Sequence, residues 1–216
     1  MMQSFSFFSR VWVVFWRVLL RLLLGKETRN NVLKVHPEIN YVIRGWYFFF
    51  SSYGILIATG DSTGLINESY KEDVYELDKI EEDDVVIDVG AHIGICTLKA
   101  AKKARKGLVV AVEPYPPNFK LLRTNLRMNR LENVVPLNIA LADYNGEAKL
   151  YIALHTYSHT ISDNMTKATD AISNRKMKVK VRTLDSLIKE LGVKRVNFIK
   201  IDAEGAELNI LKGADN

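Results

Sequence analysis

Carboxylates and glycines that follow short apolar segments are the residues of this chain best suited to bind a ligand. The segment VVIDVGAHIG places Asp88 at the end of an apolar run and follows it with Gly90 and Gly94. Glycine lets the backbone turn sharply and approach a ligand closely, and the start of the following helix presents free N–H groups. This spacing differs from the G-x-G-x-x-G that cradles a pyrophosphate, which a carboxylate would repel. The motif therefore favours a cofactor with a cationic end, namely S-adenosylmethionine.

Two further acidic positions follow apolar runs. Glu113 comes after the next run, where a carboxylate can accept hydrogen bonds from ribose hydroxyls. The segment VNFIKIDAEGAEL brings Asp202 and Glu204 to the end of another run, where they could position a nucleophile or the cofactor's amino group. For Asp88 and Glu113 the alternative is an ordinary α/β turn with N-capping acids. For the third segment the alternative is that Glu204 or Glu207 only favours the start of the next helix.

The elements that must position these acids form an alternating pattern. From residue 85 onward, short apolar runs that predict buried strands alternate with segments that predict helices, as in an open parallel α/β sheet. The expected strands are 85–88, 108–112, 134–138 and 196–202, and the expected helices are 94–103, 117–129 and 185–191. Ligands of such sheets bind at the carboxyl ends of the strands, where Asp202 stands.

Smaller strands are expected outside this alternation. Residues 40–60 predict two short strands, and a polar stretch with a short helix and an acidic link follows. Residues 147–152 and 176–183 predict two more strands. The basic residues that alternate along the second of these are Lys176, Lys178, Lys180 and Arg182. Their shared face meets either an anionic substrate or the solvent at a charge-protected strand edge.

Three segments make the chain similar to a known family. They are DVGAHIGICT at 88–97, EPYPPNFKLLRTNLRMN at 113–129, and TLDSL at 183–187 with FIKIDAEGAELNILKG at 198–213. From about residue 70 onward the chain resembles the FkbM-type S-adenosylmethionine-dependent methyltransferases. Members of this family have the class I methyltransferase (Rossmann-like) fold and mostly O-methylate hydroxyls of sugars, glycans, glycolipids or polyketides.

The resemblance implies roles for individual residues. It implies that Glu113 holds the ribose, that residues 138–140 border the adenine, and that Asp202 faces the methionine end. The residues expected to bind the cofactor are Asp88, Gly90, Ala91, His92, Gly94, Glu113, Pro114, Asn138, Ala140 and Asp202. The expected catalytic residues are Asp202 and Glu204.

The chain departs from the family pattern in two ways. His92 stands in the cofactor loop where the family usually has asparagine. The sequence stops at Asn216, whereas a fold of this class normally continues through several more strands. We therefore expect a sheet truncated after its fourth core strand, with an exposed edge.

Basic charge is concentrated near the N-terminus. The chain has a formal net charge of +5, but residues 1–31 hold five basic residues and one acid, so the remainder is almost neutral. Phosphate-backbone binding needs a basic surface on the folded domain, and we expect no nucleic-acid partner.

Residues 5–24, FSFFSRVWVVFWRVLLRLLL, predict an amphipathic helix. At 100° per residue, Arg10, Arg17 and Arg21 lie on one face, and aromatic and aliphatic residues fill the rest. Such a helix suits the membrane interface, where arginines meet headgroup phosphates. The alternatives are a helix docked on protein and a spanning or exported segment. We expect a cytoplasmic protein, peripheral on the inner face of the membrane.

The single cysteine and the histidines predict no metal site. One cysteine cannot form an internal disulfide, and Cys96 is expected to be buried and inert. His155 and His159 are four residues apart but lack the H-E-x-x-H pattern of a zinc site, so they are expected at most to contact substrate. His92 has no partner ligands at suitable spacing.

These observations predict three regions and one function. The regions are an N-terminal helix (1–31), a β-hairpin and helical lead-in (32–79), and an S-adenosylmethionine-binding methyltransferase domain (80–216). The expected function is O-methylation of a hydroxyl of a sugar, glycan or glycolipid at the membrane surface. The alternatives are an RNA or protein methyltransferase and a catalytically inactive, truncated interaction protein associated with the membrane.

Overall fold

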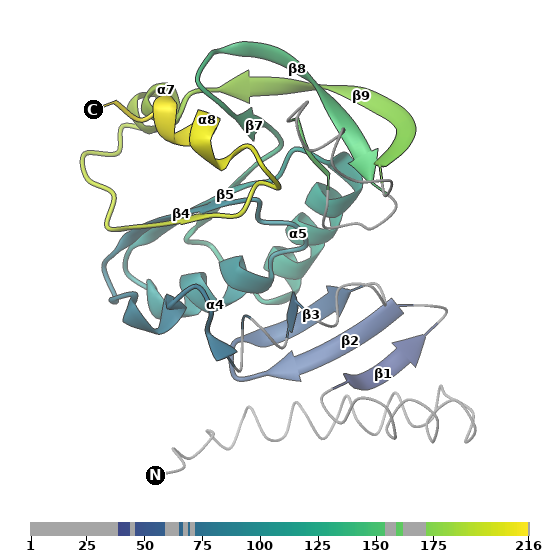
Figure 1. The fold of residues 1–216 in the computed structure, drawn as a ribbon. Coiled ribbons are helices and arrows are strands. Elements are labelled where there is room, and N and C mark those ends of the chain that lie inside the picture. Colours follow the sequence, from purple (N-terminus) through teal and green to yellow (C-terminus); the bar gives the residue numbers. More distant parts are fainter. Residues whose placement is uncertain are drawn as a thin grey trace. The chain divides into compact units, whose positions relative to one another are not determined.

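A computed structural model describes residues 39–43, 46–58, 65–66, 69, 72–153, 159–161 and 172–215 (Figure 1). The chain divides into two compact units, Met1–Gly60 and Asp61–Asn216. The predicted helix over residues 5–24 lies outside the described residues, and the predicted lead-in, residues 32–79, is divided between the two units. In the described part of the chain, no helix is both long and apolar enough to cross a membrane.

The first unit contains a three-stranded antiparallel sheet. Its strands are β1 (Ile39–Ile43), β2 (Trp46–Ser51) and β3 (Gly54–Ala58), in the order β1-β2-β3. The sequence predicted only two strands here, which is wrong. A hairpin connection needs only two residues, and the two between β1 and β2 are too few to interrupt a long apolar and aromatic stretch visibly.

The second unit contains the parallel sheet that the sequence predicted. Its strands are β4 (Val85–Val89), β5 (Leu108–Val112), β6 (Val134–Leu137) and β10 (Phe198–Ile201). They are hydrogen-bonded in the order β10-β4-β5-β6, and every neighbouring pair is parallel. The α/β fold class is therefore confirmed, and the observed strands end within two residues of the predicted ones.

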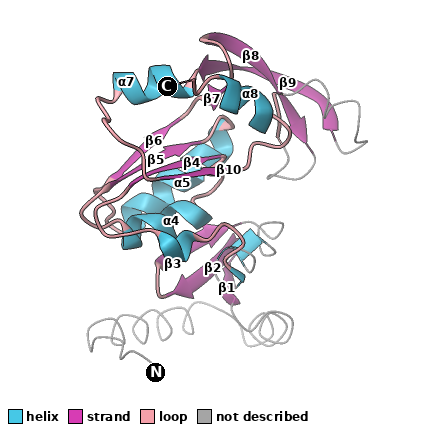
Figure 2. Cartoon of the chain, turned by 60° about the vertical axis from the view of Figure 1, so that its left-hand side comes forward, coloured by secondary structure: helices cyan, strands magenta, loops and turns pink. Residues whose placement is uncertain are grey.

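Helices cover both faces of this sheet (Figure 2). Helices α4 (Ile95–Lys103) and α5 (Pro116–Met128) lie on one face, and α7 (Leu184–Glu190) and α8 (Glu207–Lys212) lie on the other. A short 3-10 helix, η3 (Leu77–Lys79), precedes β4. Proline begins α5, where its missing N–H has no intrahelical partner to lose.

The core explains why β4 and β5 are apolar at nearly every position. Ile87 and Val110 belong to a buried cluster with residues of α7 and α8. Their neighbours Val86 and Val109 point to the opposite face and belong to a cluster with residues of α4. Because successive side chains of a strand alternate between faces, a strand covered on both sides must be apolar at nearly every position.

A second sheet of the same unit contains the basic strand. Its strands are β7 (Ala140–Leu141), β8 (Gly146–Ala153) and β9 (Ile172–Arg182), in the order β7-β9-β8. Strand β8 pairs along most of β9, whereas β7 pairs only with Val181 and Arg182. Among the described residues, the part of β9 that carries the three lysines therefore keeps one unpaired edge, as one of the two predictions had it. The face of these lysines is solvated, since Lys178 is exposed and its Nζ lies 3.1 Å from Oε2 of Glu147.

Candidate active site

The expected site residues gather around one pocket at the carboxyl ends of β4, β5 and β10. The chain adds β5 on one side of β4 and later adds β10 on the other side, so the strand order reverses at this place. Ligands of open α/β sheets bind at such a switch point. The expected residues that line the pocket are Gly90, His92, Glu113, Pro114, Ala140, Asp202 and Glu204. Those that do not line it are Asp88, Ala91, Gly94 and Asn138.

The loop after β4 needs glycine at two positions. Gly90 has a φ of +73°, and a Cβ built there would lie 1.9 Å from the backbone oxygen of Asp202. Gly94 has a φ of +94° and precedes α4, and its Cβ would lie 2.8 Å from Leu122. The backbone N–H groups of Gly90 and Ala91 donate to the carbonyl of Val112, which fixes the loop on β5. The glycines thus allow two strand ends to meet beneath the pocket.

Asp88 lies behind this loop and not in the pocket. It is 1% exposed, and the Thr97 hydroxyl donates to its Oδ2 at 2.6 Å. Its Oδ1 lies 3.3 Å from Nζ of Lys200. The sequence predicted a direct attraction between Asp88 and the cationic end of the cofactor, but in the structure a buried ammonium already neutralises this carboxylate. Asp88 is therefore linked to the loop through Lys200, which also donates to the carbonyl of Gly90.

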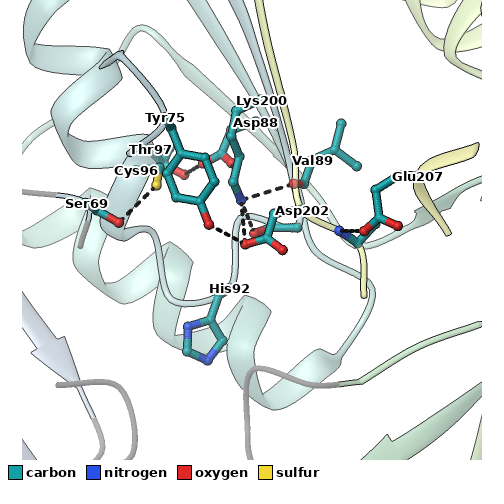
Figure 3. A network of polar contacts seen from close by, with 12 residues as sticks. Ser69, Tyr75, Asp88, Val89, His92, Cys96, Thr97, Lys200, Asp202 and Glu207 are labelled. Carbon is teal, nitrogen blue, oxygen red and sulfur yellow. Dashed lines mark hydrogen bonds and ion pairs between the residues drawn. The ribbon is translucent and has the colours of Figure 1, made fainter. Parts of the chain in front are cut away.

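Lys200 is the central residue that the sequence interpretation missed (Figure 3). It is 5% exposed, and its Nζ donates to the carbonyls of Val89 at 3.2 Å and Gly90 at 2.8 Å. Burial alone would lower the pKa of Lys200, but the neighbouring acids, Asp88 first among them, outweigh burial and raise that pKa. The side chain is therefore a fixed positive charge. A lysine inside the apolar run FIKI was the available signal, because a charge is almost never buried in a strand without a partner.

Glu113 connects the ends of β4 and β5. It is buried, and its two carboxylate oxygens accept the backbone N–H groups of His92 and Tyr115, each at 2.8 Å. His92 has a φ of +52°, a left-handed conformation that few non-glycine residues adopt. Burial raises the pKa of Glu113 to about 7, although the two hydrogen bonds oppose this shift. Its oxygens have further lone pairs, so Glu113 can still accept hydrogen bonds from hydroxyl groups.

Asp202 presents a carboxylate to the pocket at the end of β10. The Tyr75 hydroxyl donates to its Oδ2 at 2.7 Å, and Nζ of Lys200 lies 3.9 Å from the same oxygen. Its side chain is 39% exposed, unlike that of Asp88. Asp202 therefore remains able to bind a ligand from the pocket side.

The two neighbouring glutamates have different roles. Glu207 accepts the backbone N–H groups of Ala203 and Gly205 through Oε1 and thereby closes the turn before α8. Glu204 lines the pocket. Burial raises its pKa, and the charges of Asp202 and Glu207 add to that shift. Glu207 therefore has the helix-start role that was the alternative for Glu204. Glu204 is a pocket carboxylate with a raised pKa.

Most of the other residues that line the pocket are apolar. Pro114 and Ala140 line the pocket, whereas Asn138 supports it by donating from Nδ2 to the carbonyls of Glu113 and Pro114. The larger apolar lining residues are Leu65, Val89, Val112, Leu141, Leu150, Ile161 and Ile210. A flat aromatic base such as adenine can pack against apolar side chains of this kind.

The sequence also pointed to two histidines and the single cysteine. His159 lines it, and its Nδ1 accepts the backbone N–H of Ala153. His155 lies outside the described residues. Cys96 is buried as predicted, and burial raises the pKa of its thiol to about 11. In the described part of the chain, no group of three or more His, Cys, Asp or Glu side chains could hold a metal ion.

The pocket fits S-adenosylmethionine in its charge and its lining. Three carboxylates face it, from Glu113, Asp202 and Glu204, and its described lining includes no lysine or arginine. A ligand with a sulfonium and an ammonium is attracted by such a site. Its two ribose hydroxyls need acceptors, which the Glu113 carboxylate can supply, and its base needs apolar side chains to pack against.

Comparisons with known proteins agree with this chemistry. The family model described as Methyltransferase FkbM domain matches residues 88–216. "Methyltransferase 1" of Beauveria bassiana is 26% identical over 181 residues, which are 77% of this chain and 73% of that protein. "31-O-demethyl-FK506 methyltransferase FkbM" of Streptomyces tacrolimicus is 26% identical over 74% of this chain and 71% of that protein.

A third relative has a sugar acid in its name. "Hexuronic acid methyltransferase AglP" of Haloferax volcanii is 33% identical over 65% of this chain, and the match spans about half of that protein, 54%.

Among solved structures, TYW2 of M. jannaschii in complex with AdoMet is similar over 51% of this chain and 66% of that chain, with 16% identity and a TM-score of 0.35. The family model covers more than half of the chain and includes every described residue that lines the pocket except Leu65. The chain thus belongs to the FkbM family of methyltransferases, whose cofactor is S-adenosylmethionine.

Proposed function

We propose that this protein methylates a hydroxyl oxygen of a sugar, glycan or glycolipid. The observation that carries the proposal is the pair of carboxylates at the end of β10, where Glu204 lines the pocket beside Asp202 with a raised pKa. Raising the pKa of a carboxylate makes it a better acceptor for a hydroxyl proton. The names of AglP and FkbM, a hexuronic acid methyltransferase and a 31-O-demethyl-FK506 methyltransferase, support this acceptor class.

Each acidic residue has a separate task in this proposal. Glu113 accepts hydrogen bonds from the ribose hydroxyls, and Asp202 binds the ammonium of the methionine end. When bound, S-adenosylmethionine supplies an electrophilic methyl group. The acceptor oxygen forms its new bond to that methyl carbon while the electrons of the broken carbon–sulfur bond stay on sulfur, and Glu204 takes the hydroxyl proton. Since the methyl group is already activated, orientation and exclusion of water account for most of the remaining catalysis.

The test measures methyl transfer from labelled S-adenosylmethionine to glycan, lipid, RNA and protein fractions. We expect label in the glycan or lipid fraction. Glu204→Gln should lower kcat about 100-fold, as loss of a general base does, and should leave cofactor affinity close to that of the wild type. Glu132→Gln removes a charge from an exposed glutamate outside this pocket and serves as the control. Label only in RNA or protein, or no transfer despite cofactor binding, would refute the proposal in favour of one of the two alternatives.

We further propose that residues 5–24 hold the enzyme on the inner face of the membrane. The support is the sequence pattern alone, in which Arg10, Arg17 and Arg21 share one face of an otherwise apolar helix. The wild-type protein should sediment with vesicles that contain anionic lipid and should be released by high salt, because surface charge interactions are screened. A variant that lacks residues 1–24 and sediments equally well would contradict this proposal.

A further inference from the structure

A segment before the family-matched region is attached to the helix of the cofactor loop. Lys99 of α4 is fully buried, and its Nζ donates to Oδ1 of Asp73 at 2.6 Å and to the carbonyl of Ser69 at 3.4 Å. The Ser69 hydroxyl and the Cys96 sulfur lie 3.4 Å apart. A buried ammonium is stable only when such partners surround it. These contacts hold Ser69 and Asp73 against α4, and Leu65, which precedes them in the chain, belongs to the pocket lining.

This segment supplies one polar contact to the site. The Tyr75 hydroxyl donates to Oδ2 of Asp202 at 2.7 Å across 127 positions of sequence (Figure 3). Nζ of Lys200 lies 5.3 Å from the centre of the Tyr75 ring and 3.9 Å from the same Oδ2. Oδ2 is therefore engaged from the protein side, and among the described residues no group donates a hydrogen bond to Oδ1.

We propose that Tyr75 is a positioning residue of the methyltransferase site, and that it orients the Asp202 carboxylate for the ammonium of the methionine end of S-adenosylmethionine. This inference rests on the role of Asp202 in the proposed function. A carboxylate at the end of a strand can rotate about its terminal bond, and this freedom is lost when one oxygen accepts a short hydrogen bond. With Oδ2 fixed by Tyr75, Oδ1 is the oxygen left for the ligand.

The decisive variant is Tyr75→Phe, which removes one oxygen and keeps the ring beside Lys200. Its affinity for S-adenosylmethionine should fall on the order of tenfold, the usual effect of losing one hydrogen bond to a charged group. Methylthioadenosine carries the adenosine and the sulfur but has no amino-acid end, so its affinity should stay unchanged. Tyr144→Phe removes the same atom from an exposed tyrosine and should change neither affinity.

The experiment measures both ligands by titration calorimetry with the full chain, and thermal unfolding checks that each variant is folded. Tyr75→Phe should weaken S-adenosylmethionine binding no further when Asp202→Asn is already present, because the tyrosine acts through that carboxylate. A Tyr75→Phe variant that binds both ligands like the wild type, or that weakens both equally, would overturn this inference alone. A wild-type protein that binds neither ligand would overturn the proposed function together with it.

Discussion

Replacing Lys200 by methionine should destabilise the protein strongly, because it leaves a buried carboxylate without its counter-charge. Asp88 and Lys200 have side chains that are 2% and 4% exposed, and their charged atoms lie 3.3 Å apart. Removing one partner of a buried ion pair typically costs about 3–5 kcal/mol. The carbonyls of Val89 and Gly90 also lose a donor, whereas Thr97 still donates to Asp88 at 2.6 Å. We therefore expect the free energy of unfolding to fall by about 3 kcal/mol, at the lower end of that range.

The assay is urea unfolding of the full chain at neutral pH. The control variant carries the same substitution at a lysine that is exposed instead of buried. Lys178→Met makes the same substitution at an exposed lysine, whose Nζ lies 3.1 Å from Glu147. Exposed ion pairs contribute little, so the control should unfold at nearly the wild-type urea concentration. The double variant Lys200→Met with Asp88→Asn should recover part of the loss, because the amide carries no charge.

The role of the buried ion pair would be contradicted if Lys200→Met costs no more than Lys178→Met, or if Asp88→Asn recovers nothing.

Three further predictions test the site. Gly90→Ala should abolish measurable cofactor binding in titration calorimetry. Gly90 has a φ of +73°, and a Cβ there would lie 1.9 Å from the backbone oxygen of Asp202. A variant that binds the cofactor normally would contradict the close approach of the two strand ends. Since the pKa of Glu113 is about 7, cofactor affinity should fall about tenfold between about pH 8 and about pH 6 as the ribose acceptor is protonated. The same group should lower the free energy of unfolding as the pH rises from its ordinary pKa of 4.5 toward about 7, because the unfolded chain releases this proton earlier. A cofactor affinity that stays constant between about pH 8 and about pH 6 would refute the role of Glu113 as the ribose acceptor. Cys96, with a pKa of about 11, should resist iodoacetamide in the native protein at about pH 8 and react after unfolding in urea, as thiol counting by mass spectrometry would show.

Much of the fold could be predicted because its signals are local. β5 was expected at 108–112 and is observed as Leu108–Val112, since a short apolar run between polar residues determines both of its ends. Gly90 and Gly94 have the positive φ angles that their place after β4 suggested. The division between β1 and β2 was missed because it lies in a two-residue connection, and the short pairing of β7 with the end of β9 was missed because pairing order cannot be read from a single strand.

The sequence predicted the acidic residues of the site but not the residues that contact them. Asp202 and Glu204 face the pocket because they follow a strand whose carboxyl end is a ligand-binding edge. Asp88 and Lys200 both lie in apolar strands, but only their pairing in adjacent parallel strands shows that one neutralises the other. His159 reaches the pocket from a stretch with no periodic pattern at all.

The sequence by itself thus determined the α/β class, the glycine loop and the family, because apolar periodicity, glycine spacing and short motifs are properties of neighbouring residues. Only the tertiary structure decided which carboxylates line the pocket and which lie outside it in a buried ion pair. Lys200 contacts Val89 and Gly90 across more than 100 positions, and Tyr75 contacts Asp202 across 127. The charge and orientation of a buried carboxylate depend on partners brought within about 3 Å of it, and such partners are chosen by the packing of the sheet, which leaves no trace in local spacing.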